Sequence, residues 1–324
     1  MTTTIPRADP DQYRAFVAGM AFSATSSHGR VRLTGSEHLD FLHRLSTNDT
    51  LGCPVGKGLR TVFCDPKGRI VEVAELCRVE ADETYAFVGR GGAVSLIEWL
   101  DRYHFSEQIE WQDETGQDSQ IEVLGAQAAT VCADILGLDV AKLPTFACLS
   151  RDGLKAMRIE RGGHTAVRVW GADIDTVVAR LTAAGALPMH HSTYEVLRVE
   201  WGVPASAELT LEHNPWEAGL GDAIHMNKGC YTGQEVVARL DTYKKVKQHL
   251  VGLRLDGPVA PGATVEVQGR GVGAITSVAE SPTLGVIGLG YVRTAHCNAD
   301  TPITVSADEH LPTSGRISQL PFPS

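Results

Sequence analysis

One cysteine of this sequence lies in a loop suited to thiol chemistry. Cys230 follows Lys228 by two residues and precedes Thr232 and Glu235, which have the spacing of a capping box. That spacing predicts a helix that begins at Gly233 with Thr232 as its N-cap. The positive end of such a helix and the Lys228 ammonium both favour a thiolate over a thiol. We therefore predict a functional thiolate at Cys230; the alternative is a buried structural thiol, the commonest role of a free cysteine.

A basic segment follows this loop, although the chain as a whole is acidic. Its cations are Arg239, Lys244, Lys245 and Lys247, and they face one acid, Asp241. Two interpretations stay open for the segment, a solvated face or an anion-binding strip beside the Cys230 loop. The net charge of −10 argues against broad nucleic-acid binding.

Other reactive residue types do not form a recognised pattern. The seven cysteines are scattered, odd in number and without a CxxC pair, which argues against a disulfide framework and against a zinc site. The histidines at 28, 38, 43, 190 and 191 lack ligand spacing with any cysteine. The segment 269–273 has the glycines of a dinucleotide-binding turn, but β-type residues surround it, so we interpret it as a barrel turn.

The composition is that of an ordinary soluble globular chain. It has 324 residues, 43% of them hydrophobic and 21% charged, and this length suggests two or three structural units. No apolar run approaches the roughly 18 residues that cross a bilayer, and residues 1–10 lack the apolar region of an export signal. We expect a cytoplasmic protein that does not enter a membrane.

Two stretches of the chain repeat one order of elements, which is strand, helix, hairpin and helix. The elements predicted in the first stretch are a strand at 31–33, a helix capped by Ser36 and ending before 46, strands at 60–64 and 70–77 around a turn at 65–68, a strand at 85–89 and a helix at 93–103. Those predicted in the second are a strand at 121–125, a helix at 126–136, a hairpin of 157–161 and 165–169, and helices at 172–184 and 194–200. The repeated order suggests a structural duplication.

The last part of the chain has a different texture. It contains five short β-type runs divided by Gly and Pro, at 249–255, 264–267, 273–279, 285–292 and 303–306. Such runs predict a small antiparallel barrel, with the tail 316–324 extended and poorly tied down. We therefore divide the chain into an N-terminal α+β domain (1–120, with part of 200–245 as a candidate completing segment), a second α+β domain that carries the cysteine loop (121–247) and a barrel (248–324).

The cysteine loop resembles a known family signature. Lys228-Gly229-Cys230-Tyr231-Thr232-Gly233-Gln234-Glu235 is similar to the K-G-C-[FY]-x-G-Q-E signature of the YgfZ folate-binding family, whose members are relatives of the T-protein of the glycine cleavage system. Further resemblances cover nearly the whole chain, at 31–49, 65–69, 197–202 and 214–220. The resemblance implies an α+β fold of three domains in a ring around a folate channel, with two mixed domains and a small C-terminal antiparallel β-barrel.

The resemblance also implies site residues for tetrahydrofolate. It places Glu200 where T-proteins grip the pterin, whose N–H donors suit one buried carboxylate. The alternative without a ligand is that Glu200 is a carboxylate on a helix face beside Arg198. The basic strip from Arg239 to Lys247 would meet the anionic glutamate tail of folate. Other candidates for the channel lining are Asn48, Asp49, Tyr231 and Gln234.

One departure from the T-protein pattern bears on activity. T-proteins carry an aspartate central to one-carbon transfer in the segment that matches 88–96, and here that position is Leu96 or a close neighbour. A leucine cannot exchange a proton with the folate amine. The resemblance therefore implies a folate-binding protein of iron–sulfur cluster assembly or repair, with iron–sulfur proteins as partners and Cys230 as its thiolate. The alternatives are a folate-dependent aminomethyltransferase and a folate-binding scaffold or sensor without chemistry.

Overall fold

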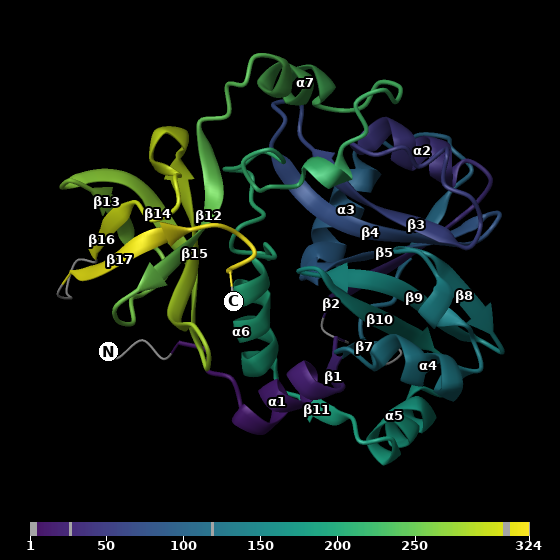
Figure 1. The fold of residues 1–324 in the computed structure, drawn as a ribbon. Coiled ribbons are helices and arrows are strands. Elements are labelled where there is room, and N and C mark those ends of the chain that lie inside the picture. The colour runs from purple at the N-terminus through teal and green to yellow at the C-terminus, as the bar shows by residue number, and fades with distance from the viewer. Residues whose placement is uncertain (1–4, 26–27, 118–119, 307–311, 324) are drawn as a thin grey trace.

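The protein consists of two antiparallel-rich sheets, a closed barrel and a helix that lies between them (Figure 1). The structure is a computed structural model that describes residues 5–25, 28–117, 120–306 and 312–323. In Figure 1 the barrel lies at the left, helix α6 (His191–Trp201) in the middle and the two sheets at the right. The predicted fold class, mixed α/β domains followed by a small C-terminal barrel, is confirmed.

The first sheet has five strands in the order β3-β4-β5-β2-β6, and every pair is antiparallel. Its strands are β2 (His28–Thr34), β3 (Lys57–Cys64), β4 (Ile70–Glu80), β5 (Glu83–Arg90) and β6 (Glu110–Asp113). Helices α2 (His38–Leu45) and α3 (Gly92–Asp101) bury Leu42 and Leu96 against one face of this sheet. The turn predicted at 65–68 is confirmed, because the Gly68 amide donates to the Asp65 carbonyl at 2.9 Å.

The second sheet has six strands in the order β11-β1-β7-β10-β9-β8. Its strands are β1 (Ala21–Ala24), β7 (Gln120–Leu124), β8 (Cys148–Arg151), β9 (Leu154–Arg161), β10 (His164–Gly171) and β11 (Leu187–Met189). Helices α4 (Ala128–Leu136) and α5 (Ile174–Ala183) cover one of its faces, and α1 (Pro10–Ala18) precedes its strand β1. A strand from the start of the chain thus belongs to the second sheet.

The two sheets repeat one topology. The order β3-β4-β5-β2 of the first sheet recurs as β8-β9-β10-β7 in the second, and α2 and α3 correspond to α4 and α5. Gly35 follows β2 and Gly125 follows β7, with φ of +119° and +115°. A Cβ would lie 2.1 Å from the Gln108 carbonyl oxygen at the first glycine and 2.4 Å from the Gly19 carbonyl oxygen at the second. The same strained corner thus starts the first helix of each repeat.

The two sheets pack face to face. Alternate residues of each central strand point to opposite sides, so that one side meets the helices and the other meets the partner sheet. Cys77 and Phe87 of the first sheet share a buried cluster with Met157 and Ala166 of the second. The helices therefore form the two outer layers of a four-layer sandwich.

Six strands close the barrel in the order β12-β15-β14-β13-β16-β17. They are β12 (Gln248–Leu255), β13 (Thr264–Val267), β14 (Arg270–Ser281), β15 (Gly285–Arg293), β16 (Pro302–Ser306) and β17 (Thr313–Ser318). The prediction of a poorly tied tail is wrong, because β17 pairs with both β12 and β16 and Phe322 is buried. The sequence pattern did not predict β17, and this strand pairs the otherwise open edges of β12 and β16.

Helix α6 joins the barrel to the sheets. Val196 and Val199 pack against barrel residues, whereas Leu197 and Trp201 belong to the cluster between the two sheets. The remaining helix, α7 (Gln234–Thr242), lies above the first sheet in Figure 1.

The predicted cap of α2 by Ser36 is wrong, since the N-cap of α2 is Glu37 and makes no side-chain cap bond.

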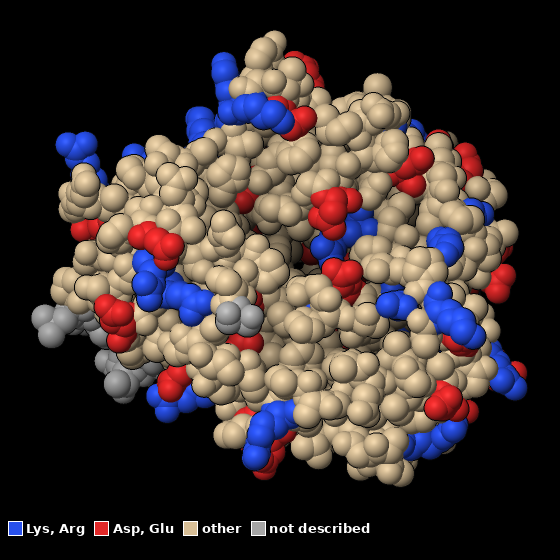
Figure 2. Space-filling model, in the orientation of Figure 1, with Lys and Arg blue, Asp and Glu red and all other residues tan. Residues whose placement is uncertain are grey.

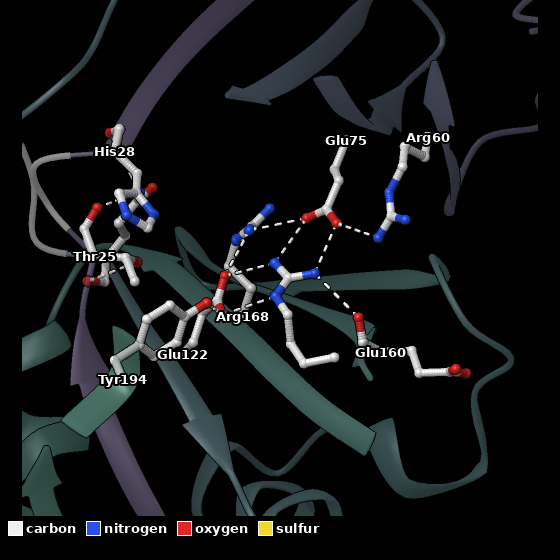
Figure 3. Close-up of polar contacts among 10 residues, drawn as sticks. Thr25, His28, Arg60, Glu75, Glu122, Glu160, Arg168 and Tyr194 are labelled. Atoms are coloured by element: carbon white, nitrogen blue, oxygen red, sulfur yellow. Dashed lines mark hydrogen bonds and ion pairs between the residues drawn. The ribbon is translucent and has the colours of Figure 1, made fainter. Parts of the chain in front are cut away.

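A network of buried charges lies between the sheets (Figure 3). Arg161 donates to both oxygens of Glu75 at 2.7 and 3.0 Å, and to both oxygens of Glu122 at 2.8 and 3.3 Å. Arg168 reaches the same two carboxylates at 2.6 and 2.9 Å and lies over the Phe87 ring. Burial alone would raise the pKa of Glu122, but the two guanidinium groups outweigh it and hold that pKa at about 2.

Replacing Arg161 with methionine should destabilise the protein strongly. The variant leaves Glu75 and Glu122 buried without their bidentate partner, and breaking such a buried pair costs about 3 to 5 kcal/mol. Urea unfolding at neutral pH measures the free energy. The matched control is Lys142→Met, which removes the exposed pair with Asp139 and should change stability little. Equal losses in the two variants would contradict the structural role of the network.

Candidate functional site

The Cys230 loop is exposed and leads into α7, as the sequence predicts. The predicted capping box is wrong, however: the N-cap of α7 is Gly233, with φ of +84° and no side-chain cap bond. A Cβ on Gly233 would lie 2.5 Å from the Asp65 carbonyl oxygen, so the loop packs directly against the β3–β4 turn. That contact selects glycine at the helix start. Cys230 remains accessible to solvent.

Lys228 fastens this loop to the end of α2. Its ammonium donates to the carbonyls of His43, Ser46 and Asn48 at 2.5, 2.5 and 2.9 Å. Three acceptors use all three donors of a lysine, and burial lowers the pKa of Lys228 to about 8. The charge of Lys228 is thus directed at backbone carbonyls, and it also lies 5.1 Å from the Tyr231 ring centre. A catalytic role for Lys228 stays a prediction.

Asn48 and Asp49 lie in the segment that Lys228 holds. The Asn48 amide group donates to the Arg60 carbonyl at 2.7 Å, and Asp49 accepts from the Gly52 amide at 3.1 Å. Asp49 Oδ1 also lies 3.3 Å from His43 Nδ1. Burial, followed by the charge of Lys228, lowers the pKa of His43. The structure therefore brings Asn48, Asp49 and Lys228 together beside the Cys230 loop.

Glu200 lies near the end of α6, where this helix meets α1 and the barrel. The Tyr13 hydroxyl reaches both carboxylate oxygens, at 3.2 and 3.1 Å, and lies 3.2 Å from Thr283 Oγ1. Burial raises the pKa of Glu200, and hydrogen bonds from Ser281 and Tyr13 oppose that rise. The Glu200 carbonyl accepts from the Phe322 amide at 3.0 Å. A half-buried carboxylate without a cationic partner among the described residues is a candidate acceptor for ligand N–H groups.

The remaining candidate residues do not gather around Glu200. Tyr231 of the cysteine loop is buried, Gln234 begins α7, and Arg239 is exposed on that helix. Lys244 pairs with Asp241 at 2.7 Å in the segment that follows. In Figure 1, α7 and α6 lie apart. The predicted site residues therefore form two groups, one at the cysteine loop and one at Glu200.

The structure adds a carboxylate that the sequence analysis missed. Glu72 of β4 lies against the start of α3, and a Cβ on Gly92 would lie 2.4 Å from its Oε2. Burial raises the pKa of Glu72 to about 7, a value suited to proton transfer at neutral pH. Leu96, one turn further along α3, is fully buried in the core. The signal in the sequence was a lone acid in the apolar run 70–74 together with paired glycines at 91–92.

The molecular surface is hollowed where the barrel and the two sheets meet (Figure 2). Acidic and basic side chains border this central hollow.

Among the described residues, no three side chains of His, Cys, Asp or Glu are arranged to hold a metal ion. None of the described helices is long and apolar enough to cross a membrane.

Comparison with known proteins agrees with this architecture. Residues 10–228 match the GCVT N-terminal domain and residues 248–322 match the glycine cleavage T-protein C-terminal barrel domain. A chloroplastic protein of Arabidopsis thaliana, which carries the provisional name of transferase, is 32% identical over 97% of this chain and 74% of its own length. The aminomethyltransferase of Bacillus subtilis is 26% identical over 92% of this chain and 86% of its own length.

A solved structure shares the fold at low sequence identity. The crystal structure of glycine cleavage system aminomethyltransferase T from Bartonella henselae superposes with a TM-score of 0.87 at 18% identity, over 98% of this chain and 91% of that one. Two consecutive family domains and a relative matched along nearly the whole chain identify the lineage. The chain therefore belongs to the GCVT family, with the N-terminal domain and the C-terminal barrel of the glycine cleavage T-protein.

Proposed function

We propose that this GCVT-family protein binds tetrahydrofolate and acts in iron–sulfur cluster assembly or repair, with Cys230 as a functional thiol. The observation that carries the proposal is the exposed cysteine in a loop that matches the YgfZ signature at every specified position. Lys228 supports the proposal, because its three hydrogen bonds to backbone carbonyls fasten that loop to the end of α2. The proposed partners are iron–sulfur proteins or their assembly factors.

The folate part of the proposal rests on Glu200. Its carboxylate is half buried and accepts hydrogen bonds from neutral side chains, among them the Tyr13 hydroxyl at 3.1 and 3.2 Å and Ser281. A pterin edge presents N–H donors of the kind that such a carboxylate binds. The Bacillus subtilis relative is an aminomethyltransferase, and the family implies tetrahydrofolate as the ligand. We also propose the cytoplasm as its compartment, although the Arabidopsis relative carries a chloroplastic name.

The choice of the YgfZ branch rests on Leu96. This residue occupies the segment that holds an aspartate in T-proteins, and it is fully buried against the first sheet. A specific observation nevertheless favours the aminomethyltransferase as a second candidate. The Glu72 carboxylate lies beside the same segment, with its pKa raised to about 7 by burial. Glu72 is therefore a candidate proton acceptor for an enzyme of that class.

Titration with tetrahydrofolate tests the folate site. Loss of charge-assisted hydrogen bonds in Glu200→Gln should weaken binding about tenfold to a hundredfold. Burial raises the pKa of Glu200, so wild-type affinity should fall as the pH falls through that pKa, because protonation removes an acceptor. The variant should lack this dependence. Glu98→Gln, at an exposed position of α3, is the control. Equal affinities for wild type and Glu200→Gln would remove Glu200 from the site.

Rescue of a deletion strain tests the thiol. We expect the wild-type gene to restore iron–sulfur enzyme activity and Cys230→Ala to fail, because the exposed thiol would be the reacting group. Cys297→Ala, at the other described cysteine that is not buried, should rescue normally. Tetrahydrofolate affinity of purified Cys230→Ala should stay normal, which excludes misfolding. Full rescue by Cys230→Ala would instead favour a scaffold or sensor.

An assay of glycine cleavage with lipoyl carrier protein distinguishes the aminomethyltransferase from the proposed iron–sulfur function. Because the segment 88–96 contains no aspartate or glutamate, we expect no tetrahydrofolate-dependent aminomethyl transfer. Turnover that disappears in Glu72→Gln and persists in Glu98→Gln would favour the aminomethyltransferase. That result would give Glu72 the proton-transfer role.

A further inference from the structure

A groove crosses the surface of the barrel outside the groups of site residues described above. It consists of two adjoining hollows of about 350 and 510 Å³, which share Arg254, Asp300 and Arg316 as lining residues. Volumes of this order accommodate small ligands or parts of larger ones. Figure 2 shows basic side chains gathered on the barrel near the C-terminal end of the chain, with acidic side chains beside them.

Two arginines lie side by side in the lining of this groove. Arg254 of β12 and Arg316 of β17 are directly opposite in the strand register, an arrangement in which like charges repel. Neither forms an ion pair with an aspartate or glutamate among the described residues. Arg254 donates one bond, at 2.7 Å, to the Pro323 carbonyl, and Arg316 is exposed. The pair therefore offers guanidinium donors to an anion from outside.

Two acids limit which anions fit. Asp256 lines the larger hollow and Asp300 lines both. A compact anion with high charge density would be repelled by these carboxylates while it contacts the arginines. An extended chain with single, separated carboxylates can place each charge at a guanidinium and keep clear of the aspartates. The groove thus favours a polycarboxylate chain over a phosphate.

Two residues that line the groove are chain neighbours of residues at the Glu200 site. Leu284 lines the larger hollow and follows Thr283, whose hydroxyl lies 3.2 Å from the Tyr13 hydroxyl. Pro323 lines the smaller hollow and follows Phe322, whose amide donates to the Glu200 carbonyl. The lining of the groove thus lies one residue along the chain from contacts made by Tyr13 and by Glu200.

We infer that this groove binds the γ-linked polyglutamate tail of the folate whose ring Glu200 would hold. The inference rests on the proposed function and names the part of the ligand that reaches the barrel. It places the glutamate tail elsewhere than the basic strip from Arg239 to Lys247, which begins on α7; that helix lies apart from α6 in Figure 1. Arginine is suited to this role because its planar fork binds carboxylates in a bidentate manner.

Comparison of tetrahydrofolate carrying one and three glutamates tests the inference by titration calorimetry. We expect the triglutamate to bind wild type about tenfold more tightly, as one additional charge-assisted contact provides. In Arg316→Gln the ratio of the two dissociation constants should fall to near unity. The Arg316 side chain makes no hydrogen bond to another described residue, so this variant leaves the bond between Arg254 and the Pro323 carbonyl intact. Arg270→Gln, at an exposed barrel position outside the groove, should keep the wild-type ratio.

Three results would overturn the inference. The first is a wild-type ratio near unity, and the second is an unchanged ratio in the double variant of Arg254 and Arg316. The third is displacement of the triglutamate by inorganic phosphate at lower concentration than by free γ-linked triglutamate, which would mark a phosphate site. If wild type binds no tetrahydrofolate, the proposed function fails. The groove is then judged by free γ-linked triglutamate, whose binding must appear in wild type and disappear in Arg316→Gln.

Discussion

The pairing of Arg161 with Glu75 and Glu122 is the interaction on which the arrangement of the site depends. Glu75 belongs to the first sheet and Glu122 to the second, so one guanidinium joins the two repeats across their shared core. Glu122 also accepts from the Tyr194 hydroxyl of α6 at 3.1 Å. The same helix carries Glu200. The orientation of the proposed pterin carboxylate is thus linked to a charge network in the core.

A second branch of this network leads to the cysteine loop. Arg60 pairs with Glu75 at 3.2 Å, and its carbonyl accepts from the Asn48 side chain. The Asn48 carbonyl in turn accepts from Lys228, two residues before Cys230. Burying such charges is costly unless every partner is in place. That cost gives the network geometric specificity, because a shift of either sheet leaves a buried charge unpaired.

The two groups of site residues imply a division of labour. Glu200 offers an acceptor for a ligand ring where α1, α6 and the barrel meet, whereas the Cys230 loop presents a thiol at the outer surface near α7. A ligand at Glu200 therefore does not have to contact Cys230 for both to serve one function. Glu72 lies in a third place, at the start of α3, and its raised pKa links it to proton transfer.

The sequence by itself determined the local elements, because periodicity and turn residues act over a few positions. The turn at 65–68, the hairpin over Gly162-Gly163, helix α6 and five of the barrel strands follow from such patterns. Tertiary structure decided the rest. Lys228 binds carbonyls 180 to 185 residues away in the chain. Gly233 replaces the predicted cap because a distant turn packs on it, and Glu72 of β4 contacts Gly92 at the start of α3. Such contacts depend on how the repeats pack, and no local pattern encodes them.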